Sequence, residues 1–79
     1  EGRQLWTVLY IAPSRSVALR IRDFMEAEGI LVRLRPLGLR TDDHTTDYEI
    51  LVTEVELEEA QEVLHQALQV RQFRELRTK

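Results

Sequence analysis

Residues 5–37 decide the fold, because a strand, a helix and a second strand follow one another there without a break. The stretch reads LWTVLYIAPSRSVALRIRDFMEAEGILVRLRPL. Residues 5–11 are almost wholly apolar and rich in β-branched and aromatic side chains, which predicts a strand buried on both faces. Pro13 cannot donate to a sheet ladder, and Ser14 is suited to cap the first amides of a helix. We therefore predict that the strand ends here and a helix begins.

The helix is predicted over residues 15–28. Its apolar residues recur at three- and four-residue steps and form one stripe: Val17, Ala18, Ile21, Phe24 and Met25. Gly29 follows at the position where a helix often ends in the left-handed conformation. The second strand is predicted over residues 30–37, because apolar and polar side chains alternate there before Pro36 and Gly38.

The second half of the chain predicts a strand and a helix after a polar loop at residues 38–47. Alternation over residues 48–52 indicates the third strand, and Thr53 with Glu56 reads as a capping box. The inner stripe of the following helix is expected to begin at Val55 or Leu57 and to continue through Ala60, Val63, Leu64, Ala67 and Leu68. Residues 69–79 favour a continued helix over an edge strand or a frayed tail.

The predicted order β-α-β-β-α indicates an α+β sandwich of the ferredoxin-like kind. A β-α-β crossover makes a parallel pair, and the third strand fits between the first two, antiparallel to both. Both helices then cover one face of a three-stranded sheet. The usual fourth strand is absent unless the tail supplies it. We expect one domain, residues 1–79, with a core over 5–68 and a C-terminal extension over 69–79.

Composition narrows the class of protein. The chain has 79 residues, no cysteine, and a net charge of −3 from 14 acidic and 11 basic residues. The absence of cysteine excludes disulfides and thiolate metal sites and fits a reducing compartment, so a cytoplasmic location is expected. Mild acidity argues against nucleic acid as a partner, and no apolar run has the length of a membrane span. So small a chain buries a modest core, which favours stabilisation by a partner subunit.

The predicted architecture leaves one sheet face and the outer edge of the first strand uncovered. Whichever way that strand is turned, the uncovered face receives an apolar set: Trp6, Val8 and Tyr10, or else Leu5, Leu9 and Ile11. The other two strands add Leu31, Arg33, Arg35, Glu49 and Leu51. A mixture of apolar and paired charged side chains is typical of a subunit interface. We therefore expect a homo-oligomer, most simply a dimer, with Trp6, Val8, Tyr10, Leu31 and Leu51 as interface residues.

Four stretches of the chain resemble a known family. They are LYIAPS at 9–14, FMEAEGI at 24–30, YEILV at 48–52 and EEAQEVL at 58–64. Together they look like the small bacterial domains called prokaryotic signal-transducing proteins, a domain of unknown function, over roughly residues 6–68. That family is similar in fold to the nitrogen-regulatory PII proteins and to amino-acid-binding ACT domains, so the resemblance implies an oligomer that binds a small effector. The loop at 38–47 is shorter than the PII loop and lacks a phosphate-binding signature, so ATP binding is not implied.

Arginines are the best candidates for ligand contacts. Arg33 and Arg35 point the same way from the second strand, and Arg40 lies in the following loop. Planar guanidinium groups suit carboxylate or phosphate ligands. The competing interpretation, which we favour, is cross-strand pairing with Glu49 or a salt bridge at a subunit interface.

Metal binding and catalysis have weaker support. Asp42, Asp43, His44 and Asp47 share one loop and could ligate zinc, manganese or nickel, but their spacing matches no known site, and a solvated loop is the simpler interpretation.

Glu58, Glu62 and His65 fall on one helical face, where ordinary surface pairing explains them better than acid–base catalysis. Ser14 and Ser16 have no nearby base. We expect no enzyme and no cofactor. The sequence favours a regulatory module that binds a small anionic effector or a partner protein; the alternative is a purely structural interaction domain without a small ligand.

Overall fold

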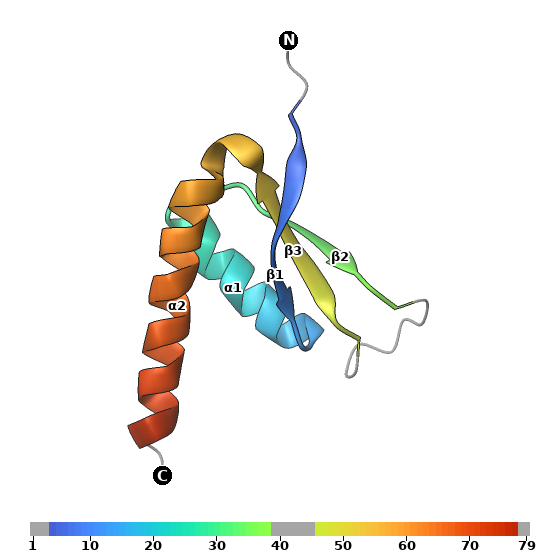
Figure 1. The fold of residues 1–79 in the computed structure, drawn as a ribbon. Coiled ribbons are helices and arrows are strands. Elements are labelled where there is room, and N and C mark those ends of the chain that lie inside the picture. The colour runs from blue at the N-terminus through green and yellow to red at the C-terminus, as the bar shows by residue number, and fades with distance from the viewer. Residues whose placement is uncertain (1–3, 39–45, 78–79) are drawn as a thin grey trace.

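The computed structural model describes residues 4–38 and 46–77 of the chain, with side chains described as far as residue 69. Its elements are β1 (Trp6–Ala12), α1 (Arg15–Ala27), β2 (Arg33–Pro36), β3 (Tyr48–Thr53), a 3-10 turn (Glu54–Glu56) and α2 (Leu57–Arg77). The sheet order is β1-β3-β2, and both outer strands run antiparallel to β3. Figure 1 shows the two helices on the same side of this sheet. The predicted β-α-β-β-α order and the central position of the third strand are confirmed.

Local sequence signals account for α1 and both of its ends. The Ser14 hydroxyl accepts a hydrogen bond from the Val17 amide at 3.3 Å, as expected of an N-cap. At the other end Gly29 has a φ of +87°, a conformation that strains other residues. The amides of Gly29 and Ile30 donate to the carbonyls of Glu26 and Met25, at 3.0 and 3.1 Å. These two bonds form a Schellman motif, which ends the helix and turns the chain towards β2.

The second strand is shorter than its sequence pattern predicts. Pairing with β3 begins only at Arg33, although residues 30–37 were expected to be extended. Ile30 and Val32 are nevertheless buried in the core at 1% and 9% exposure. Ile30 and Val32 alternate with exposed residues because they pack into the core. They do not pair with β3 in the sheet.

The start of α2 differs from the predicted capping box. Thr53 makes no side-chain hydrogen bond to a backbone amide, and its hydroxyl instead lies 3.5 Å from a Glu56 carboxylate oxygen. A 3-10 turn therefore precedes the helix, and Leu57 rather than Val55 begins the packed stripe; Val55 is 87% exposed. The helix then runs to Arg77, so the preference for a helix over residues 69–77 is confirmed and this segment adds no fourth strand.

The core lies between the two helices and the face of the sheet that they cover. Its buried members come from β1, α1, the segment before β2, β3 and α2: Ala12, Ala18, Ile21, Met25, Ile30, Val32, Ile50, Val52, Ala60, Val63 and Leu64. Partly buried side chains such as Phe24 and Leu34 complete the packing. Among the described residues, every buried side-chain nitrogen or oxygen has a hydrogen-bond partner. The helix stripes read from the sequence are therefore the stripes that build this core.

A β-bulge in β1 changes which of its side chains share a face. Val8 pairs with Leu51, whereas Tyr10 pairs with Ile50, so Leu9 is an extra residue in β1. Before the bulge, Trp6 and Val8 lie on the face away from the helices; after it, that face receives Ile11. Tyr10 packs against the core instead. The expectation that Trp6, Val8 and Tyr10 share one face is therefore wrong for Tyr10, because strict alternation fails at the bulge.

Candidate functional site: the uncovered sheet face

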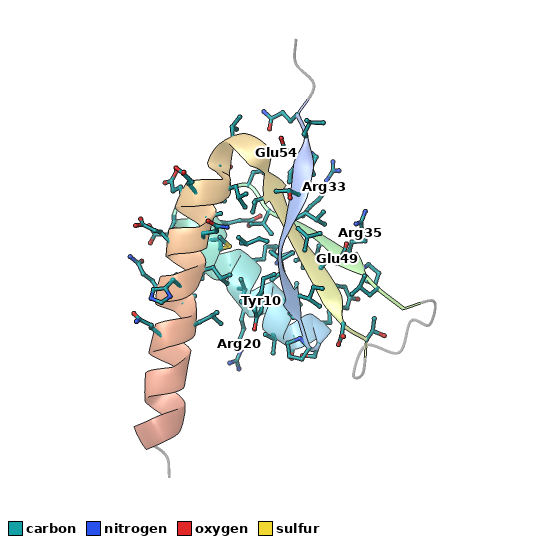
Figure 2. All side chains as sticks on the ribbon, viewed as in Figure 1. Tyr10, Arg20, Arg33, Arg35, Glu49 and Glu54 are labelled. Atoms are coloured by element: carbon teal, nitrogen blue, oxygen red, sulfur yellow. The ribbon has the colours of Figure 1, made fainter. Side chains whose placement is uncertain are left out.

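The side of the sheet opposite the helices is covered by no element within the described ranges, and we call it the open face. Its residues, assigned from the strand register, are Trp6, Val8, Ile11, Arg33, Arg35, Glu49, Leu51 and Thr53. Figure 2 shows Arg33, Arg35 and Glu49 on this side, with Tyr10 directed towards the helices. The open face is the surface that the sequence analysis expected to carry an interface, with Ile11 in the place of Tyr10.

The apolar part of the open face is centred on β1. Val8 is 41% exposed and Ile11 is 48% exposed, so the prediction that this strand is buried on both faces is wrong. Leu51 of the central strand is only 6% exposed, and it does not belong to the core cluster between sheet and helices. Its register partners, Val8 on one side and Arg33 on the other, flank it. The open face thus has a small apolar centre of its own.

Arg33 and Trp6 are in contact with each other on the open face. The Arg33 guanidinium carbon lies 4.5 Å from the centroid of the Trp6 ring, within the range of a cation–π interaction. Trp6 is on β1 and Arg33 on β2, so the contact spans the central strand above Leu51. The contact therefore joins side chains of the two outer strands across the central one.

Arg35 pairs with Glu49 in the adjacent strand. Its Nε donates to a Glu49 carboxylate oxygen at 2.8 Å, and its terminal nitrogen forms a salt bridge with the same oxygen. The Glu49 side chain is 14% exposed, whereas that of Arg35 is 61% exposed. This pair is the cross-strand interaction that the sequence analysis favoured over ligand binding for Arg35, so Arg35 is not a free ligand contact in this structure.

Arg33 differs from Arg35, because no carboxylate in the described part of the chain lies within salt-bridge distance of it. The three strands contribute three charged residues, all on the open face: two arginines and one glutamate. Subtracting the Glu49 charge from the two arginine charges leaves one net positive charge on this face, against −3 for the whole chain. The open face is therefore apolar on β1 and cationic on β2.

The remaining sequence candidates do not join this site. Arg40, Asp42, Asp43 and His44 lie outside the described residues, and Asp47 is exposed just before β3. Leu31 is 58% exposed just before β2 and borders the open face.

The acid–base candidates on α2 are Glu58, Glu62 and His65, and all three are exposed. No hydrogen bond or ion pair joins them, and the residues that can be described hold no cluster of metal-ligating side chains. Ser14 caps α1, and its hydroxyl lies 3.2 Å from that of Ser16. The three α2 residues are therefore surface residues, and Ser14 is a helix cap.

Ile11 is the residue of this site that sequence reasoning assigned to the wrong set. It was grouped with Leu5 and Leu9, because strict alternation places residues 5, 9 and 11 together. In the structure Ala12 faces the core at 0% exposure, and its neighbour Ile11 therefore lies on the open face at the end of the strand. No residue type in β1 marks the bulge itself, since neither glycine nor proline occurs there.

Fold and site together define a small α+β domain of β-α-β-β-α order with one uncovered, arginine-bearing sheet face. Comparison with protein-family models, with curated proteins and with solved structures found no match, so no family is identified for the chain. Within the described ranges, neither helix combines the length and apolar character needed to cross a bilayer.

Proposed function

We propose that this protein is a non-catalytic regulatory module that acts as a homodimer, with the open face as the contact between its two copies. The observation that carries the proposal is the apolar centre around Leu51 on a side of the sheet that no described element covers. Tryptophan and arginine, which dominate the binding energy of protein interfaces, meet over this centre. We favour a second copy of the chain as the partner on this face, because its own exposed Val8 and Ile11 can cover those of the first copy.

The size of the open face predicts a weak dimer. Three strands about 4.8 Å apart, the longest of 7 residues at about 3.3 Å each, span at most about 14 by 23 Å, or roughly 300 Å² in projection. Protruding side chains and the bordering Leu31 enlarge the accessible area. A stable contact buries about 800 Å² per partner, so this face falls at the transient end of the range. A weak contact suits a regulatory role, because a modest free-energy change can make or break it.

Sedimentation velocity over a concentration series tests the dimer. We expect the weight-average sedimentation coefficient to rise from the monomer value towards the dimer value through the micromolar range. Val8→Lys should abolish the rise, because it places a charge among the exposed apolar side chains of β1. An edge strand such as β1 tolerates a lysine. Val55→Lys is the matched control: Val55 is equally apolar and 87% exposed, but it lies on the 3-10 turn and not on the open face. Concentration-independent sedimentation of the unmodified chain would reject the proposal.

A ferredoxin-like assignment supports a second candidate, in which a partner strand pairs with the outer edge of β1. That fold adds its fourth strand beside the first, and α2 runs on to Arg77 where the fourth strand would begin. The β1 edge carries no charged residue to protect it, which favours pairing with another chain. The bulge at Leu9 opposes it by interrupting the row of backbone groups.

We rank strand addition at the β1 edge below face-to-face association for that reason. Amide hydrogen exchange separates the two modes, because strand addition protects the outer-edge amides of β1 and face-to-face contact leaves that edge open. Unchanged exchange of the β1 amides on self-association would exclude strand addition as the mode of contact.

The proposal agrees with the family that the sequence resembles, a family of bacterial signal-transducing proteins. It includes a cytoplasmic location and a small effector as the regulating ligand. Arg33 is the described residue best placed to meet such an effector, because no carboxylate among the described residues engages its donors.

A further inference from the structure

We draw no further inference here: the strongest candidate, the surface patch of exposed apolar residues Leu5, Leu31 and Val55 at the end of the sheet where β1 and β2 begin and β3 ends, carries nothing because nothing in the structure shows what covers it.

Discussion

Truncation of a valine on each face of the sheet should have very different effects on stability. Val52 lies on the helix-covered face at 0% exposure, and Val8 lies on the open face at 41% exposure. Val→Ala removes the same two methyl groups at both positions. The comparison therefore holds the chemistry constant and varies only the face, which makes it a direct test of how the sheet is covered.

The expected magnitudes follow from burial. Each buried carbon contributes about 0.8 kcal/mol, so Val52→Ala loses about 1.6 kcal/mol of transfer free energy. The cavity that it leaves in a packed core raises the total to roughly 2–3 kcal/mol. Val8 is 41% exposed and opens to solvent, so Val8→Ala should lose about 1 kcal/mol and leave no cavity. In a domain of this size each kcal/mol lowers Tm by about 4–8 °C, so we expect decreases of roughly 10–20 °C and 4–8 °C.

Thermal unfolding followed by circular dichroism measures both effects. At dilute protein the difference between the two variants should be largest, because the monomer dominates. At high concentration dimerisation stabilises the unmodified chain by mass action, so the deficit of Val8→Ala should grow while that of Val52→Ala stays constant. Equal Tm decreases at dilute protein would refute the assignment of the two faces.

Three further predictions concern the elements that hold the open face in place. Gly29→Ala should cost about 1–2 kcal/mol of unfolding free energy through backbone strain alone, because φ is +87° and nothing lies within 4 Å of the added Cβ; unchanged urea denaturation would contradict this. Ser14→Ala should cost about 1 kcal/mol by removing the α1 cap, whereas Ser14→Asp should retain most of the stability in the same measurement. A double-mutant cycle of Arg35→Ala and Glu49→Ala should give a coupling of roughly 0.2–1 kcal/mol that shrinks as salt is added, since the Arg35 side chain is 61% exposed; a coupling insensitive to salt would show that the pair is not an exposed one.

The parts of the fold that sequence predicts well are those where one local signal has one structural meaning. Gly29 after an amphipathic helix predicted the left-handed residue, and Ser14 after Pro13 predicted the cap. The strand order followed from the crossover rule and from the ferredoxin-like arrangement, in which the third strand lies between the first two. In each case the physical requirement, a positive φ or an orphan amide, admits few residue types.

The remaining features depend on interactions that single positions do not specify. The bulge at Leu9 arises from pairing between β1 and β3, and it reverses the faces of Tyr10 and Ile11 although nothing in the strand's composition marks it. Thr53 and Glu56 have the residue types of a capping box, but a 3-10 turn brings their side chains together instead of to the backbone. The sequence therefore predicts that an apolar surface lies on the uncovered side of the sheet. It does not predict which β1 residues form that surface.

Chemical cross-linking tests most directly whether the open face joins two copies. The chain has no cysteine, so Val8→Cys and Val55→Cys each introduce one thiol, the first on the open face and the second on the 3-10 turn. A bifunctional maleimide with a reach near the roughly 10 Å spacing of stacked sheets then links thiols across the contact. At micromolar protein we expect Val8→Cys to form covalent dimer in much higher yield than Val55→Cys. Equal yields, or a higher yield for Val55→Cys, would contradict the open face as the interface.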